Sequence, residues 1–330
     1  MSAADMRILG IGGVGIAGIA SFLPENSEDN FVRCRELYAD PVKAESVVKT
    51  TGIRARRIAG EGVSSLDLCL KATGRLFESV AVDKRDLAAV VSVTFTPERI
   101  MPGSAFQAQK RLGLSEDVLA FDLNHACSGW VYGLYLAAML VRQTGRKVLL
   151  LDGDVQSRHL APDDPATVPV LADAGTATLL APDPDAPDWR FAFLTRGDGG
   201  EALTLPVGGT ISMDGFAVYR FVAGEVVRFV KDFFAATGTT SADYDAFVPH
   251  QANVYMIRQL AKTLGFPSER LMVSADELGN SASATIPVTI SRGGFTSGEN
   301  RRLLVAGYGA GLSAAVADIR FAGPCIGSGE

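Results

Sequence analysis

The chain has 330 residues, of which 47% are hydrophobic and 21% charged, and it contains 35 glycines. This composition is typical of a well-packed globular protein and excludes a fibrous or intrinsically disordered chain. The formal net charge of −6, without a long basic run, excludes the electrostatic footprint of a nucleic-acid-binding protein.

The first predicted element is an apolar stretch, residues 8–23, which resembles a signal peptide. Asp5 precedes it, Arg7 supplies the only nearby positive charge, and five glycines interrupt it, so we expect a buried strand. Gly10 to Gly15 satisfies the dinucleotide pattern GxGxxG, which should follow a strand and open a helix. Only Met6 to Leu9 are available to form the strand before it, and the residues after it are predicted to form a strand that reaches Pro24, so a nicotinamide dehydrogenase is disfavoured.

The cysteines and the apolar runs indicate where the protein resides. The chain has no CxxC motif, no Cys/His cluster at metal-ligand spacing and no run of about 20 apolar residues that could span a bilayer. We therefore expect a soluble, cytoplasmic protein with reduced thiols, no metal site and no membrane association. The cysteines are Cys34, Cys69, Cys127 and Cys325.

The middle of the chain repeats the order of its elements. A buried strand at 88–93, a helix ending at Leu112 and a strand at 118–123 lead to Cys127. A strand at 245–249, a helix ending at Leu264 and a strand at 271–274 lead to Asn280. Buried strands at 147–154 and 302–309 form a third matching pair. The pattern predicts a duplicated α/β unit with mostly parallel sheets covered by helices.

We place the boundary between the two halves in the Pro- and Asp-rich segment 181–189, which gives halves of residues 1–182 and 183–330. Equivalent strand ends meet in a duplicated α/β fold. Residues from the two halves can therefore converge at one site.

Cys127 lies at a predicted turn from strand to helix, among the small residues Ala126, Ser128 and Gly129. The partial positive charge of a helix N-terminus favours the thiolate, so Cys127 is a candidate nucleophile. The alternative is an inert buried thiol.

His250 ends a buried strand, and Asn280 lies in a second strand-to-helix turn. Taken singly, a histidine at a strand end or a capping asparagine is more often structural than catalytic. Together, imidazole and amide can donate hydrogen bonds to the enolate oxygen that forms when a malonyl thioester loses carbon dioxide. Cys127 would carry the acyl electrophile. A backbone amide within the glycine-rich turn 307–313, with the amide of Cys127, would complete an oxyanion hole. Of the three histidines, we expect only His250 to be functional.

With these residues the chain resembles beta-ketoacyl-ACP synthase III of the thiolase superfamily. The resemblance rests on residues 16–26, the Thr-Gly-Ile-Arg segment at Thr51, the Cys127 block, the Pro-His-Gln-Ala-Asn block at His250 and the Gly-Asn-Ser block at Asn280. It implies the five-layer αβαβα thiolase fold, a homodimer, and an acyltransferase that performs ping-pong Claisen condensation with the triad Cys127, His250 and Asn280. Acyl-CoA or acyl-ACP and a malonyl thioester would be substrates, and no cofactor is implied.

The resemblance also assigns residues outside the triad. Ala310 takes the place of the glycine whose amide completes the oxyanion hole with that of Cys127, and Met101 that of a gate to the partner subunit's acyl pocket. Arg258 and Lys262 would dock an acyl carrier protein. Ser46 and Thr50 stand where the family has a Trp and an Arg for coenzyme A, and Tyr255 replaces a docking Arg.

These departures leave the donor open between coenzyme A and carrier protein. They also favour a specialised pathway, making a secondary metabolite such as a polyketide or a surface glycoconjugate, over housekeeping fatty acid biosynthesis.

Three other functions are possible for this sequence pattern. A degradative thiolase would need a second cysteine in the turn 307–313, which has none. An acyltransferase that passes the acyl group to an alcohol or amine would use the same fold. A noncatalytic subunit would be expected to lose part of the triad.

Overall fold

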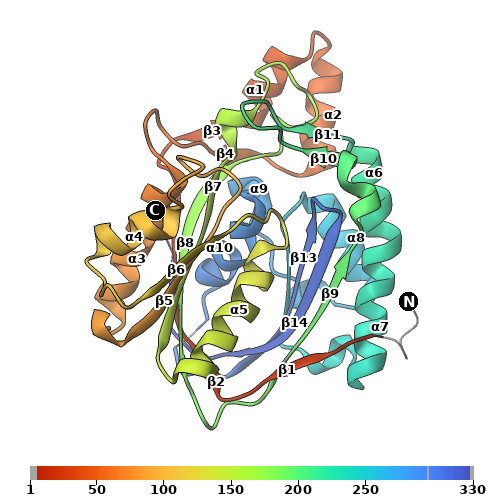
Figure 1. Cartoon of the computed structure of the whole chain (residues 1–330). Coiled ribbons are helices and arrows are strands. Elements are labelled where there is room, and N and C mark those ends of the chain that lie inside the picture. The colour runs from red at the N-terminus through yellow and green to blue at the C-terminus, as the bar shows by residue number, and fades with distance from the viewer. Residues whose placement is uncertain (1–5, 296, 328–330) are drawn as a thin grey trace.

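Two β-sheets and three helical layers make up the molecule. The structure, a computed structural model, describes residues 6–295 and 297–327. Helices cover the outer face of each sheet, and two helices lie between the sheets, which gives the predicted five-layer αβαβα arrangement (Figure 1).

Each sheet has a defined strand order. Within the described residues the larger sheet contains, in spatial order, β15 (Cys325–Ile326), β2 (Val14–Phe22), β8 (Asp173–Pro182), β7 (Lys147–Val155), β5 (Leu87–Val93) and β6 (Leu119–Leu123). The other sheet contains, within the same ranges, β1 (Leu9–Ile11), β9 (Trp189–Thr195), β14 (Ser313–Phe321), β13 (Arg301–Gly309) and β12 (Ala246–Pro249).

The main helices belong to the three helical layers. One outer layer holds α3 (Ser65–Ser79) and α4 (Ser104–Leu112), and the other holds α7 (Val227–Thr237) and α8 (Val254–Leu264). The middle layer holds α5 (Gly129–Thr144) and α10 (Thr285–Arg292). The predicted helix ends at Leu112 and Leu264 are confirmed, because Gly113 and Gly265 adopt the left-handed conformation that stops a helix.

Smaller elements cover one end of the layers (Figure 1). They are β3 (Ser27–Asp29), α1 (Asn30–Leu37), α2 (Pro41–Thr51), β4 (Ala55–Arg57), β10 (Leu203–Thr204), β11 (Ser212–Met213), α6 (Gly215–Phe221) and α9 (Ala275–Leu278).

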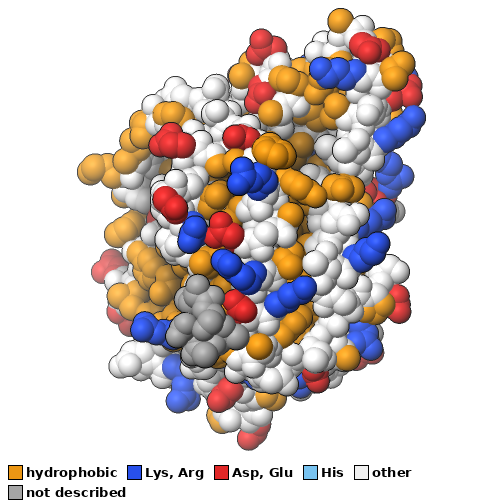
Figure 2. Space-filling view, turned by 90° about the vertical axis from the view of Figure 1, so that its right-hand side faces the viewer, with side chains coloured by type: hydrophobic (Ala, Val, Ile, Leu, Met, Phe, Trp, Pro, Cys, Tyr) orange, Lys and Arg blue, Asp and Glu red, His pale blue; other side chains and the backbone are white. Residues whose placement is uncertain are grey.

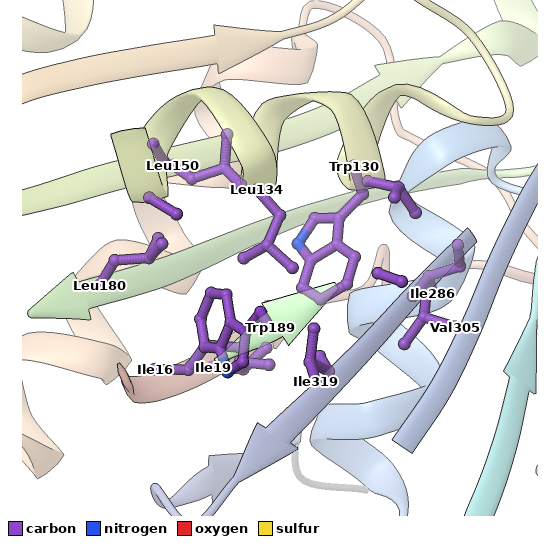
Figure 3. Close-up of a cluster of buried hydrophobic side chains, with 14 of the residues drawn as sticks. Ile16, Ile19, Trp130, Leu134, Leu150, Leu180, Trp189, Ile286, Val305 and Ile319 are labelled. Carbon is purple, nitrogen blue, oxygen red and sulfur yellow. The ribbon is translucent and has the colours of Figure 1, made fainter. Parts of the chain in front are cut away.

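Side chains from both sheets meet in the middle layer. Trp130 on α5 and Trp189 on β9 are fully buried there with Leu134 and other apolar side chains (Figure 3). Trp130 donates from Nε1 to Thr178 Oγ1 at 3.1 Å, so its polar atom is satisfied inside the core. This packing fixes α5, and with it the residues just before α5, against both sheets.

The two sheets repeat one strand order, which is the duplication that the sequence predicts. The order β2-β8-β7-β5 in one sheet matches β9-β14-β13-β12 in the other. The segment that follows α8 takes the place of β6. The predicted boundary after residue 182 falls between β8 and β9, which lie in different sheets. As limits of the two halves, residues 1–182 and 183–330 stay a prediction.

Two details of the predicted sheets are wrong. The sheets are mixed rather than mostly parallel, because β8 and β14 run antiparallel to both of their neighbours. The predicted strand 271–274 is only an isolated bridge between Phe247 and Leu271. The buried side chain of Gln251 takes over its hydrogen bonds, because Oε1 accepts from the amide of Ser274 at 2.9 Å and Nε2 donates to the carbonyl of Met272 at 3.2 Å.

The GxGxxG segment opens no helix. Its residues form β1, a tight turn with Gly13 at φ 72°, and the start of β2. This is the strand structure that the sequence predicts. No helix among residues 6–295 and 297–327 is long and apolar enough to cross a membrane.

Candidate active site

Cys127 lies between the end of β6 and the start of α5, as predicted. The amides of Cys127 itself and of Ala310 both donate to its Sγ atom. Burial nevertheless raises the pKa of the thiol to about 11, so the expected stabilisation of the thiolate by the helix is outweighed in the resting protein. The two amides remain directed toward the sulfur, so they can donate to the carbonyl oxygen of a thioester formed there.

The second amide comes from the turn between β13 and β14. Gly309 precedes Ala310, and a Cβ atom at Gly309 would lie 2.5 Å from Cys127 Sγ, so only glycine fits there. Ser313 donates from Oγ to the carbonyl of Ala310 at 2.7 Å, and its Oγ lies 2.8 Å from that of Ser128. These hydroxyls tie the turn to the start of α5.

His250 follows β12 directly, and its amide donates to the carbonyl of Ala306 at 2.7 Å. Its Nδ1 atom lies 2.8 Å from Thr285 Oγ1, which leaves Nε2 for a ligand. Burial lowers the pKa of His250 to about 3, so the imidazole is neutral at physiological pH. A neutral imidazole can donate one hydrogen bond without bringing a positive charge.

Asn280 is held by four hydrogen bonds to its backbone and side chain, one of which its carbonyl accepts from the amide of Ala172 at 2.8 Å. Its amide donates to the carbonyl of Val170 at 2.9 Å, and its carbonyl accepts from Gln156 Nε2 at 2.8 Å. Its side-chain Oδ1 accepts from the amide of Ala282 at 2.9 Å. The Nδ2 amino group forms no hydrogen bond within the described residues. Because Oδ1 is occupied, Nδ2 is the group available to a ligand.

One cavity of about 450 Å³ brings Cys127, His250 and Asn280 together, although they lie far apart in the sequence. Its remaining wall is mostly apolar and comes from short loops and helix ends that gave no sequence signal. The apolar lining includes Phe95, Val170, Leu171, Leu203, Leu205, Ile211, Met213, Val218 and Met256.

His125 also lines this cavity, and the expectation that His250 is the one functional histidine stays a prediction. Its ring packs on Tyr132 with a centroid distance of 4.3 Å, and burial lowers its pKa. Its position two residues before Cys127 was the signal that sequence reasoning passed over. His159 does not line the cavity.

The other predicted site residues lie outside the cavity. Met101 is 81% exposed on the loop before α4, so a role in a partner subunit's pocket stays a prediction. Arg258 and Lys262 are exposed on one face of α8, four residues apart. Ser46 and Thr50 are exposed on α2. Among residues 6–295 and 297–327, no group of three or more His, Cys, Asp or Glu side chains could hold a metal ion.

A thiol, a neutral imidazole and an amide facing one apolar cavity, on a duplicated five-layer fold, define a condensing enzyme of the thiolase class. Residues 121–200 match the family 3-oxoacyl-(acyl-carrier-protein) synthase III, and residues 234–321 match the C-terminal family of the same enzymes. The chain belongs to the beta-ketoacyl-(acyl-carrier-protein) synthase III family.

Relatives and solved structures agree with this assignment. Beta-ketoacyl-(acyl-carrier-protein) synthase III 2 of Streptomyces coelicolor is 35% identical over 92% of each chain. The synthase III of Rhodopirellula baltica is 30% identical over 91% of this chain and 96% of its own. The crystal structure of a 3-oxoacyl-(acyl-carrier-protein) synthase from Burkholderia xenovorans has a TM-score of 0.91 at 31% identity, with 98% of each chain covered. The alternative of transfer to an alcohol or amine is not favoured.

Proposed function

We propose that Cys127 accepts an acyl group from a thioester and that this group is then condensed with a malonyl thioester. The observation that carries the proposal is the convergence of two backbone amides on Cys127 Sγ, in the cavity that His250 and Asn280 also line. In the first half-reaction, the sulfur adds to the donor carbonyl, its proton passes to the departing thiol, and the amides of Cys127 and Ala310 hold the oxyanion.

In the second half-reaction, the malonyl thioester loses carbon dioxide and the electrons of the broken carbon–carbon bond form an enolate. His250 Nε2 and Asn280 Nδ2 donate to the enolate oxygen. The enolate carbon attacks the acyl carbonyl on Cys127, and Cys127 leaves as the thiolate, which takes up a proton from water as the 3-oxoacyl product forms. Donation from Nε2 requires that the single hydroxyl hydrogen of Thr285 turns from the carbonyl of Ala282 to Nδ1.

A carrier protein is the proposed bearer of the substrates. Arg258 and Lys262, with Arg220 on α6, form no ion pair within the described residues, whereas Lys49 and Arg54 near α2 are paired with acidic side chains. Basic side chains gather on the face that carries α7 and α8 (Figure 2). Unpaired cations favour an acidic partner there. The exposed Ser46 and Thr50 offer no cation or ring to a coenzyme A nucleotide.

The proposed assembly is a homodimer. In the described chain β6 is an edge strand with unpaired backbone groups, and Leu119 on it is 51% exposed. Ile100, Met101 and Phe106 on the neighbouring loop and helix are also exposed. A second copy that covers this edge would place Met101 toward its neighbour's acyl site.

The pathway is proposed to be a specialised one. The departures at Ser46 and Thr50 from the family pattern support this. A structural neighbour at TM-score 0.85 and 27% identity is the priming beta-ketosynthase of a polyketide biosynthetic pathway.

Mass spectrometry of the intact protein, incubated with panels of acyl-CoA and acyl-carrier donors, tests the proposal. We expect a mass increase that maps to Cys127 and is lost in Cys127→Ser. Malonyl carrier protein added afterwards should release carbon dioxide and a 3-oxoacyl product. Asn280→Ala should retain the label and lose condensation. An absence of labelling by every donor would contradict the covalent mechanism.

A further inference from the structure

The turn after Asn280 carries a backbone conformation that needs external support. Ala282 has φ 53°, the one non-glycine residue of the described chain in the left-handed region. An alanine is strained in this conformation relative to its usual regions. The amide of Ala282 orients Asn280 at 2.9 Å, and its carbonyl accepts from Thr285, the hydroxyl that contacts His250. Asn280 therefore depends on this turn directly, and His250 depends on it through Thr285, whose Oγ1 is held by the turn until its hydrogen turns to Nδ1.

A buried hydrogen bond anchors the turn to the larger sheet. Ser283, the residue after Ala282, donates from Oγ to Oδ1 of Asp152 on β7, and both side chains are completely buried. Ser283 also lies against the start of α5, because a Cβ atom at Gly129 would be 3.2 Å from the Ser283 Cβ atom. At Ser283 the turn is therefore held by this hydrogen bond on one side and packs against the start of α5 on the other.

Ser283 is the one hydrogen-bond partner of the Asp152 side chain among the described residues. The Oδ2 atom of Asp152 is buried without a hydrogen-bond partner among the described residues, and no ion pair of those residues includes it. Burial raises its pKa well above the usual range, because a carboxylate without a cation is poorly solvated in the core. A buried acid without a cation is costly, and an apolar residue would fill the same place in the core without that cost.

We infer that Asp152 is a positioning residue for the condensation step, because it holds, through Ser283, the strained Ala282 turn that orients Asn280 and His250. The inference rests on the proposed roles of those two residues. Asp152 touches neither substrate nor Cys127, so the acyl-loading step does not depend on it.

The test compares the two half-reactions in four variants of the full-length protein. Asp152→Val and Ser283→Ala each remove one end of the hydrogen bond, and the double variant removes both. Asp152→Asn keeps an oxygen that accepts from Ser283. Ser291→Ala is the matched control, because it removes another buried hydroxyl, on α10 beyond the turn, where Ser291 donates from Oγ to Ser21 Oγ at 2.8 Å. The rate of acyl labelling of Cys127 and the rate of carbon dioxide release from malonyl carrier protein are measured separately.

We expect Asp152→Val and Ser283→Ala to lower the kcat of carbon dioxide release at least tenfold while labelling stays within twofold of the wild-type rate. The double variant should be no slower than the slower single variant, and Asp152→Asn should restore most of the rate. Release within twofold of wild type in both single variants would overturn the inference. So would an equal fall of both half-reactions. If the wild-type protein itself neither labels nor condenses, the proposed function fails instead.

Discussion

At Cys127 the backbone of another segment comes so close that a single methyl group decides access to the thiol. Gly309→Ala would put a Cβ atom 2.5 Å from Sγ, at a φ of 154° that an alanine rarely adopts. We expect acyl labelling to slow at least a hundredfold because the turn must shift away and take the Ala310 amide with it. Mass spectrometry of the intact protein, after the labelling reaction is quenched at a series of times, measures this rate.

Gly74→Ala is the control for that substitution. Gly74 lies inside α3, where an added Cβ atom meets nothing within 4 Å. It should stabilise the helix by about 0.5–1 kcal/mol and leave labelling unchanged. Equal labelling rates in both glycine variants would show that the close approach at Gly309 has no effect on the thiol.

A buried carboxyl near Cys127 makes stability depend on pH. Asp154 accepts four hydrogen bonds at Oδ1, yet burial raises its pKa to about 7 from the ordinary value of 3.8. Between these values the unfolded chain has lost the proton that the native state keeps, so this group lowers the free energy of unfolding as the pH rises. At acidic pH below 3.8 its contribution is fully retained.

Asp154→Asn cannot ionise but keeps the accepting oxygen. We expect its free energy of unfolding, relative to wild type, to increase by about 1–3 kcal/mol between pH 4 and pH 8. Urea denaturation at a series of pH values measures the difference. A difference that stays constant with pH would mean that Asp154 titrates normally in the folded protein.

Among the elements, the segment after α8 shows how one side chain substitutes for a strand. Gln251 donates to the carbonyls of Pro249 and Met272 and accepts from the amide of Ser274, so it satisfies groups that a strand ladder would otherwise pair. Because the segment leaves the sheet here, the chain reaches Asn280 by the short helix α9 instead of by a direct strand-to-helix turn.

Gln251→Leu should therefore lower the free energy of unfolding by about 3 kcal/mol, since it leaves several buried backbone groups without partners. Chemical denaturation monitored by circular dichroism tests this. Gln259→Ala, which changes an exposed glutamine on α8, serves as the comparison and should stay within about 0.5 kcal/mol of wild type. A similar small loss in both variants would refute the structural role of Gln251.

For the whole molecule, the open edge at β6 bears on assembly. Leu119→Lys places a charge in the apolar surface that the proposed dimer would bury, so we expect a monomer. Light scattering coupled to size-exclusion chromatography reports the mass. Val207→Lys, at a residue 91% exposed in another loop, should leave the mass unchanged. A wild-type monomer, or a dimer that survives Leu119→Lys, would argue against this edge as the interface.

The sequence by itself was sufficient for the duplicated α/β architecture and the order of its elements. Buried strands and amphipathic helices are local patterns, and the helix-stopping Gly113 and Gly265 act within one turn. The positions of Cys127 and His250 at strand ends were also predictable, because the ends of equivalent strands meet in such a fold. Asn280 follows the short helix α9 instead of the predicted strand.

Only the tertiary structure decided the direction of β8 and β14, the loss of the strand at 271–274 and the resting state of the thiol. Strand direction depends on which strands become neighbours, and the lost strand depends on where the Gln251 side chain finds its partners. The helix position of Cys127 favoured a thiolate, but burial in the folded core raises its pKa to about 11. The apolar cavity wall likewise has no local signal, because burial is set by residues far away in the chain.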